Sequence, residues 1–361
     1  MDNRLKMTVE TPLTIAIHKL SLKQNLASEE SCSALLQIME GVATPAQIAA
    51  FATALRMKGE TVDEVFGCVQ AMRSKMLRVS PSHRPLLDTC GTGGSLLRVF
   101  NVSTTAAFAA AAAGIGIAKH GNRAMSGVSG SADVLETLGV NLSLNPLQIA
   151  ECIDMVGIGF LFAPQHHPAM RHAAPIRREI RIRTIFNLLG PLTNPADAEL
   201  RVMGVYDPAL CSLAANVLKK LGVRRALIVH GEAGLVEIST IGSTLVYELR
   251  EGEIESYTLS PQALGLTGIE PTADLIAPSN DPGINAQYVL QALEGVDDTP
   301  ASRARRDLVA VNLAASLRVA GECDGWKEAV EMAQAILSDK SGLKSLNDYI
   351  AFSGSFSNLM K

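Results

Sequence analysis

The stretch that decides the fold is LLDTCGTGGSLLRVFNVSTTAAFAAAAAGIGIAKHGNRA, which covers residues 86–124. Its apolar opening, Leu86–Cys90, predicts a short buried strand that ends in the glycine turn Gly91–Gly94. The alanine-rich run that begins near Ser103 predicts a helix, and Ile115–Ala118 predicts a second strand. This order of strand, turn, helix and strand is the repeating unit of a sheet with helices on its faces.

The same alternation continues along the chain. We expect a helix at Ser131–Leu138, strands at Phe160–Ala163 and Ala226–Val229, a helix from Asp207-Pro208 to Gly222, and helices at Ser302–Val319 and Trp326–Leu337. Alternating strands and helices favour a central, mostly parallel sheet flanked by helices. The fold class predicted for this part of the chain is therefore α/β.

The first part of the chain has a different pattern, with helices only. Thr44–Gln47 and Thr61–Glu64 are capping boxes, each followed by apolar residues at helical spacing. The proline-bounded segment Pro81–Pro85 marks a boundary. We therefore predict a small all-helical domain over residues 1–82, joined by a later helical contribution from about 170–200, and a larger α/β domain over residues 83–361.

The composition limits the class of protein. The net charge is −4 over 361 residues, so no overall field attracts nucleic acid or an anionic membrane. The six cysteines are scattered without a CxxC pair, which favours buried or idle thiols in a reducing compartment. The start of the chain lacks a signal-peptide pattern, and no uninterrupted apolar run reaches about 18 residues. We expect a cytoplasmic protein with neither a membrane nor a nucleic-acid partner.

Two polar, glycine-rich segments follow successive strands of the expected sheet, Gly91–Thr104 and Lys119–Ser131. Glycines let a backbone approach an anion closely, and Asn101 and Ser103 supply further donors where the next helix begins. Lys119 lies just past the second predicted strand, where an ammonium group can reach a phosphate. Either segment alone is explained as well by a solvated turn. Two of them at neighbouring strand ends favour a phosphate site.

Longer motifs resemble those of one enzyme family. The motifs are GTGG (91–94), FNVSTTAA (100–107), AKHGNRAMSGVSGSADVLETLGVNL (118–142), FLFAPQHHPAMRHAAPIRREIRIRTIFNLLGPLTNPA (160–196) and HGEAGLVEIS (230–239). In their order and spacing they resemble the motifs of anthranilate phosphoribosyltransferases. The resemblance covers nearly the whole chain and implies a fold like that of the nucleoside phosphorylases. It also implies transfer of a phosphoribosyl group from phosphoribosyl pyrophosphate to the amine of anthranilate, giving N-(5-phosphoribosyl)anthranilate and pyrophosphate in tryptophan biosynthesis. Mg²⁺ as cofactor and a homodimer belong to the same expectation.

The resemblance carries roles onto matching residues of this chain. The substrate site is expected to include Gly91, Gly94, Ser95, Asn101, Ser103, Thr104, Lys119, His120, Gly121, Asn122, Arg123, Ser131 and Arg177. Within this set, Asn122 and Arg177 would meet anthranilate, and most of the others the pyrophosphate and ribose phosphate. Ser103 and Glu237 would hold Mg²⁺, which prefers oxygen ligands and keeps several waters.

Three features of the motifs have competing interpretations. A guanidinium can bind a carboxylate through two parallel hydrogen bonds, which suits Arg177, but most arginines of Arg171–Arg183 are equally explained as a solvated helix face. His120 is a candidate acceptor for the proton that the amine loses, and a histidine bonded to backbone is the alternative. The pair His166-His167 has no carboxylate or cysteine at ligand spacing, which favours a helix start or pocket wall over a metal site.

The chain departs from the family pattern at two acidic positions. Ser95 follows GTGG where the family usually has aspartate, and Val236-Glu237 replaces an Asp-Glu metal pair. We expect a working enzyme with an altered demand for metal. Two alternatives are a paralogue that acts on another arylamine in a secondary pathway, and a non-catalytic relative that binds phosphoribosyl ligands or nucleic acid.

Overall fold

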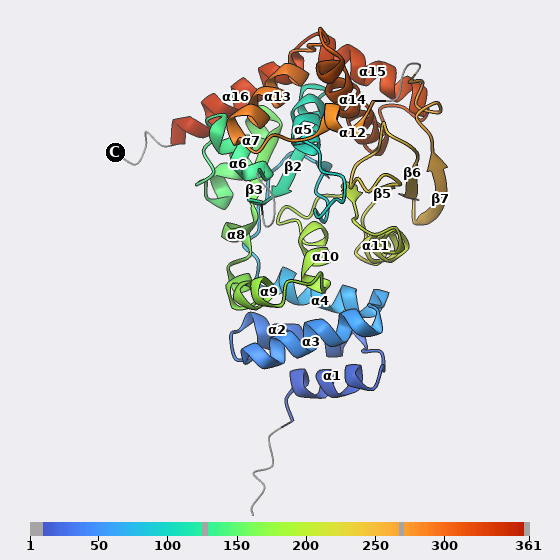
Figure 1. The fold of residues 1–361 in the computed structure, drawn as a ribbon. Coiled ribbons are helices and arrows are strands. Elements are labelled where there is room, and N and C mark those ends of the chain that lie inside the picture. The colour runs from blue at the N-terminus through green and yellow to red at the C-terminus, as the bar shows by residue number, and fades with distance from the viewer. Residues whose placement is uncertain (1–9, 125–128, 267–270, 357–361) are drawn as a thin grey trace, which may run out of the picture. The chain divides into compact units, whose positions relative to one another are not determined.

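The computed structural model describes residues 10–124, 129–266 and 271–356, and the chain divides into two compact units (Figure 1). One unit is helical and comprises the chain up to Met76 together with His167–Leu189. The other comprises Leu77–His166 and the chain from Gly190 onward, and it contains a sheet. The predicted fold class, a small helical domain and a larger α/β domain with a mostly parallel sheet, is confirmed.

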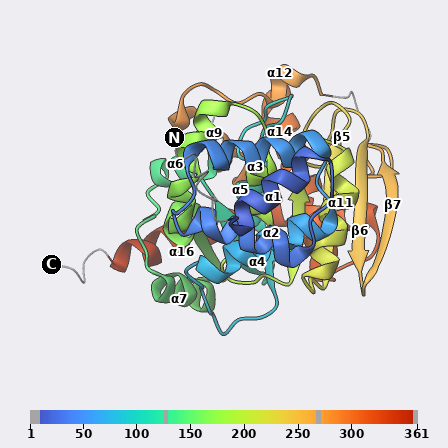
Figure 2. The same cartoon turned by 90° about the horizontal axis from the view of Figure 1, so that it is seen from below.

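The helical unit is built from short helices with strong start signals. They are α1 (Pro12–Ser21), α2 (Ser28–Met39), α3 (Pro45–Lys58), α4 (Val62–Lys75), η1 (Pro168–His172), α9 (Ala174–Ile180) and the first residues of α10 (Ile185–Leu192). Both predicted capping boxes are present: the hydroxyls of Thr44 and Thr61 accept from the backbone N–H groups of Gln47 and Glu64. Helix α1 packs on α2 and α3, α2 packs on α4, and α9 packs on α3 (Figure 2).

The α/β unit is organised around a seven-stranded sheet in the order β3-β2-β1-β4-β5-β6-β7. The strands are β1 (Leu86–Asp88), β2 (Gly116–Gly121), β3 (Ile158–Phe162), β4 (Leu200–Gly204), β5 (Arg225–Gly231), β6 (Thr244–Arg250) and β7 (Glu253–Leu259). The first five strands pair in parallel, and β6 and β7 add an antiparallel hairpin at the β5 edge. The carboxyl ends of β2, β1, β4 and β5 therefore share one edge of the sheet.

Helices pack against this sheet and against each other. They are α5 (Val102–Ala112), α6 (Ser131–Thr137), α7 (Pro146–Val156), α8 (Ala163–His166), α11 (Ala209–Lys220), α12 (Ala273–Ile276), α13 (Pro282–Leu293), α14 (Pro300–Ala320), α15 (Trp326–Ser338) and α16 (Ser341–Ser355), besides the end of α10. Alanine-rich α5 lies against β2, α14 and α16. At its crossing with α16, a side chain on Gly342 would approach the Ala109 Cα to 3.2 Å, so small residues permit the close packing.

Several sequence-based boundaries need correction. The second strand was expected to end at Ala118, but β2 continues to Gly121, so Lys119 and His120 lie inside a strand and not in the loop after it. Strands β4, β6 and β7 had no counterpart in the prediction. Part of the second polar segment, residues 125–128, lies outside the described residues.

Candidate functional site

The glycine turn Gly91–Gly94 leaves β1 at the shared carboxyl edge of the sheet. Thr92 donates its backbone N–H to the Gly204 carbonyl at 2.8 Å, which ties the turn to the end of β4. A side chain on Gly91 would lie 2.9 Å from that same carbonyl, so the position requires glycine. Gly93 and Gly94 have φ values of 63° and 77°, in the left-handed region. The turn is thus a close-packed backbone loop with no bulky side chain at its tip.

Helix α5 begins a few residues later and presents an uncapped N-terminus. Its N-cap, Asn101, makes no side-chain hydrogen bond to the first turn. The Val102 N–H donates to the Phe100 carbonyl at 2.7 Å. The N–H groups of Ser103 and Thr104 in the same turn remain available to an anion, and the helix dipole favours negative charge there. Ser103 is half-buried in this first turn and Thr104 is buried. The structure thus brings these three residues to one helix start.

Lys119 points from β2 to the same helix start. Its Nζ donates to the carbonyl and the hydroxyl of Thr89 at 3.3 and 3.1 Å, and to the Ser103 Oγ at 3.4 Å. The residue is 3% exposed. Burial lowers the pKa of the Lys119 amine, while the negative charges of Asp88 and Glu237 oppose that shift. The result is a buried ammonium group aimed at the anion-binding end of α5.

Glu237 supplies a carboxylate near this ammonium group. Its Oε2 is buried and has no hydrogen-bond partner among the described residues. Burial raises the pKa of Glu237 to about 7, although a backbone hydrogen bond and the charge of Lys119 act in the opposite direction. The unsatisfied Glu237 oxygen and the Ser103 hydroxyl each interact with Lys119, and both are hard oxygen donors of the kind that Mg²⁺ prefers. The chemistry of the two residues expected to hold the metal therefore suits it, and their role as ligands stays a prediction.

Val236, beside Glu237, packs against the end of β4. A side chain on Gly204 would collide with the Val236 backbone carbonyl, so glycine at this position allows the 236–237 segment to approach the glycine turn. Among the described residues, no group of three or more His, Cys, Asp or Glu side chains is arranged to hold a metal ion.

The second polar segment begins inside β2 and continues beyond its end at Gly121. A side chain on Gly121 would collide with the Ser131 Oγ, and that hydroxyl donates to the Asn122 carbonyl at 3.3 Å. Asn122 is exposed and its side-chain oxygen accepts from the backbone of Arg123. The Arg123 guanidinium binds Glu136 and Asp133 on α6, at 2.8 and 3.0 Å. The position of the Arg123 guanidinium is thus explained by its ion pairs with α6, and its contact with substrate stays a prediction.

His120 is bonded to backbone, which was the alternative to its role as a proton acceptor. Its Nδ1 lies 3.1 Å from the Gly190 carbonyl, and the side chain is 3% exposed. Burial, aided by the neighbouring His166, lowers the pKa of His120 to about 3. An imidazole held neutral in this way is a weak proton acceptor, so the geometry favours a backbone-bonded role. His166 ends α8 and binds the Leu77 carbonyl through Nδ1 at 2.9 Å.

Arg177 belongs to the helical unit, where it lies on α9. Its guanidinium carbon is 5.8 Å from the centre of the Phe186 ring, a cation–π contact that orients the side chain. The residue is half-buried, and burial lowers the pKa of the guanidinium. Arg178, its neighbour, is exposed. Arg177 is therefore distinct from the solvated arginines of this segment.

Sequence reasoning missed a buried polar group beneath Lys119. It consists of Asp88, Asn194 and Arg201, of which the aspartate binds the other two at 2.8 and 2.7 Å. Arg201 is a charged residue within β4, and its charge is one reason the strand is hard to find from the pattern of apolar residues. The available signal was Asp88 itself, a carboxylate in an otherwise apolar strand, which at 1% exposure needs partners.

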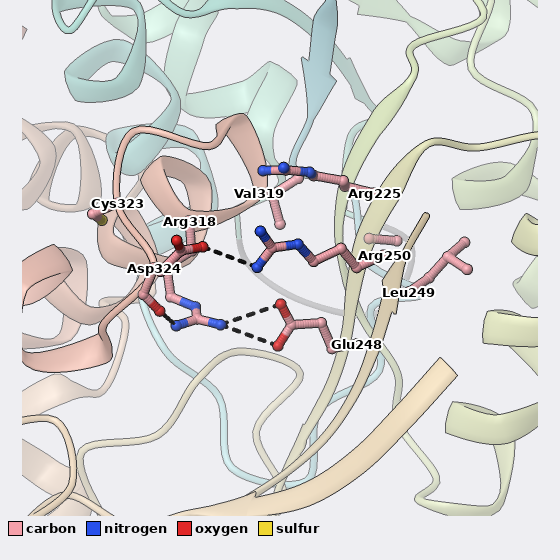
Figure 3. Close-up of a pocket in the computed structure, with 9 residues that line it drawn as sticks. Arg225, Glu248, Leu249, Arg250, Arg318, Val319, Cys323 and Asp324 are labelled. Carbon is pink, nitrogen blue, oxygen red and sulfur yellow. Dashed lines mark hydrogen bonds and ion pairs between the residues drawn. The ribbon is translucent and has the colours of Figure 1, made fainter. Parts of the chain in front are cut away.

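A separate hollow lies at the opposite end of β5. Arg225, the first residue of that strand, lines it together with Arg250, Arg318, Glu248 and Asp324 (Figure 3). Arg318 binds Glu248 at 3.1 Å, and Arg250 binds Asp324 at 2.9 Å. These ion pairs join β6 to α14 and to the segment that follows it, so the hollow is explained as a structural cluster.

Comparison with known proteins gives a consistent result. Residues 83–342 match the model of the glycosyl transferase family, a/b domain, and residues 14–76 match that of its helical bundle domain. The chain is 46% identical to anthranilate phosphoribosyltransferase of Acetivibrio thermocellus over 94% of this chain and 96% of the relative. It is 49% identical to the Herpetosiphon aurantiacus enzyme over 90% and 94%.

Solved structures of the same enzyme are similar throughout. That of Thermus thermophilus has a TM-score of 0.86 and 39% identity, covering 94% of this chain and 99% of the other. The Saccharomyces cerevisiae enzyme in complex with PRPP and Mg also has a TM-score of 0.86, with 29% identity over 95% and 98%. Within the described residues, no helix has the length and apolar character needed to span a membrane.

Proposed function

Because this chain belongs to the anthranilate phosphoribosyltransferase family, we propose that it transfers the phosphoribosyl group of phosphoribosyl pyrophosphate to the amine of anthranilate. The observation that carries the proposal is the convergence of three features at one edge of the sheet. They are Lys119, the uncapped start of α5, and the Glu237 carboxylate, whose Oε2 is buried. No relative described above favours another arylamine as acceptor.

Pyrophosphate leaves with a large negative charge, so the chain's task is to bind and stabilise that charge. A cation comes from Lys119, and oriented donors come from the glycine turn and from the N–H groups of Ser103 and Thr104 at the start of α5. Ser103 and Glu237 would hold Mg²⁺, which when bound neutralises phosphate charge. In the transfer, the C1′–oxygen bond to pyrophosphate breaks and a bond from C1′ to the amine nitrogen forms.

The acceptor is activated mainly by its placement. An arylamine is neutral at pH 7 and carries its own lone pair, so orientation contributes more than deprotonation before attack. We assign the acceptor's carboxylate to Arg177, whose guanidinium suits a bidentate contact, and further contact to Asn122. The nitrogen sheds one proton after the bond forms, and solvent can accept it. No step requires His120 to take up the proton.

The direct experiment mixes protein, anthranilate, phosphoribosyl pyrophosphate and Mg²⁺ and follows the loss of anthranilate fluorescence. Turnover is expected, and its absence at high enzyme concentration would refute the proposal. In Arg177→Lys, the KM for anthranilate should rise at least tenfold, because a bidentate contact becomes a single one, while the KM for phosphoribosyl pyrophosphate stays unchanged. The matched control is Arg178→Lys on the exposed face of α9, which should alter neither constant.

On the family resemblance alone, we also propose that the protein acts as a homodimer in the cytoplasm, in tryptophan biosynthesis. Light scattering of the purified protein tests the first point: a monomeric mass at micromolar concentration would contradict it. Growth without tryptophan of a host that lacks this activity, after introduction of the chain, tests the pathway.

A further inference from the structure

Asp88 is a buried carboxylate that the proposed reaction does not use directly. It is the last residue of β1 and is 1% exposed. Its Oδ2 accepts from Arg201 Nη1 at 2.7 Å and from Asn194 Nδ2 at 2.8 Å, and its Oδ1 accepts from the His120 N–H at 3.1 Å. One side chain thus joins β1 to β4, to β2 and to the segment after α10.

Side chains bind the backbone of β2 where β1 is too short to pair with it. β1 pairs with β2 only at Leu86 and Leu87, so β2 extends beyond its neighbour. In that extension, the His120 N–H binds Asp88, and the Ala118 carbonyl accepts from Asn194 at 2.8 Å. Both groups face the β1 side and flank Lys119, because backbone groups of alternate residues point to the same side of a strand.

Lys119 is consequently held from two sides. On the β3 side it pairs in register with Phe160, and on the β1 side its two neighbours are bound by Asp88 and Asn194. The residue after Asp88, Thr89, provides the carbonyl and hydroxyl that accept from Lys119 Nζ. The position of Asp88 therefore affects both the backbone and the ammonium group of the lysine.

Arg201 keeps the carboxylate in place. Its side chain is 2% exposed, and its Nε and Nη2 have no hydrogen-bond partner in the part of the chain that the structure describes. A guanidinium cannot lose its proton in a protein, so the buried arginine depends on Asp88 for its counter-charge. The aspartate is thus fixed by an ion pair and remains available to bind β2.

We propose that Asp88 is a positioning residue, which with Asn194 fixes Lys119 where phosphoribosyl pyrophosphate binds. The inference rests on the proposed function, because it takes that substrate as the ligand of Lys119. Precise placement matters at such a site, since a charged group that is displaced by even about 1 Å loses much of its contact with a phosphate. Loss of the Asp88 contacts should therefore weaken binding of this substrate and leave anthranilate binding unaffected.

The test compares two double variants that remove the same buried charges. Asp88→Asn with Arg201→Met retains an oxygen that can accept the His120 N–H, whereas Asp88→Leu with Arg201→Met has a similar shape without that oxygen. Binding of phosphoribosyl pyrophosphate is measured by calorimetry, and both KM values by fluorescence. We expect the leucine variant to bind this substrate about tenfold more weakly than the asparagine variant, with equal KM values for anthranilate.

Equal affinities of the two folded double variants for phosphoribosyl pyrophosphate would overturn the inference. If the leucine variant does not fold, Asn194→Ala decides the question, because it keeps the Asp88–Arg201 ion pair and removes the amide's contacts to Asp88 and to the Ala118 carbonyl. It should raise the KM for phosphoribosyl pyrophosphate alone, and an unchanged value overturns the inference. A wild-type protein that neither binds nor uses this substrate would instead contradict the proposed function.

Discussion

Replacement of Glu237 by glutamine is expected to abolish a pH dependence of metal binding. In the wild-type chain, burial raises the pKa of this carboxyl from its ordinary value of 4.5 to about 7. A metal ion binds the ionised carboxylate, so one proton competes with it, and affinity falls about tenfold for each pH unit well below that pKa. Between pH 8 and pH 6, the affinity of the wild-type protein for Mg²⁺ should therefore fall about tenfold.

The measurement uses Mn²⁺ as the probe for this site, with the free ion followed by its electron paramagnetic resonance signal. Phosphoribosyl pyrophosphate is left out, because phosphate groups titrate in the same pH range. Glu237→Gln should bind the ion weakly and with little dependence on pH. Glu232→Gln removes an exposed carboxylate nearby in sequence and should behave like the wild type. Equal affinity of the wild type at pH 6 and pH 8 would refute the reasoning.

The same shift in pKa predicts the sign of an effect on folding. The folded protein holds the Glu237 proton more tightly than the unfolded chain does. This tighter binding of the proton stabilises the folded protein. The stabilisation is fully present below about pH 4.5 and is lost as the pH rises through about 7. In the absence of metal, the free energy of unfolding of the wild type relative to Glu237→Gln should therefore decrease over this interval. A difference that stays constant over it would contradict the raised pKa.

Two further predictions concern departures from expected residue types. Arg181 ends α9 with a φ of 52°, a left-handed conformation that costs an arginine free energy and a glycine little. Arg181→Gly should therefore stabilise the helical unit by about 0.5–1 kcal/mol in thermal unfolding, whereas Arg178→Gly within the helix should destabilise it by about 1 kcal/mol. Destabilisation by Arg181→Gly would contradict backbone strain at this position. Ser95→Asp and Val236→Asp should each change the Mg²⁺ concentration that gives half-maximal activity, and an unchanged metal dependence in both would refute an altered metal demand.

The sequence predicted the elements that have their own local signals. Hydroxyl caps fixed the starts of α3 and α4, and glycine turns separated the helices from the strands around residues 86–121. The β6–β7 hairpin was missed because its strands are largely polar on one face, although Glu251-Gly252 between two alternating runs is a hairpin signal. Strand β4 was missed in part because Arg201 interrupts its apolar run.

The candidate site was predictable only where a motif carried it. The glycine turn, the start of α5 and Lys119 are neighbours in sequence and in space, so their grouping could be inferred. The Asp88–Asn194 contact joins residues 106 positions apart, and no local sequence pattern predicts it. Two related contacts explain why the end of β2 was misplaced. The His120 N–H binds Asp88 and the Ala118 carbonyl binds Asn194, so side chains distant in sequence satisfy backbone groups of this part of the strand.

The two acidic positions that this chain lacks lie on segments that bind each other. Leu96 and Leu97 both donate their N–H groups to the Gly234 carbonyl, at 2.9 and 3.3 Å. Ser95 directly precedes the first of these donors, and Val236 follows Gly234 by two residues. Carboxylates at both positions would repel each other unless a cation lay near them, whereas neutral side chains let the segments stay in contact without one. The neutral side chains of Ser95 and Val236 therefore avoid a repulsion between two segments that contact each other, and Glu237 follows directly after the second of these positions.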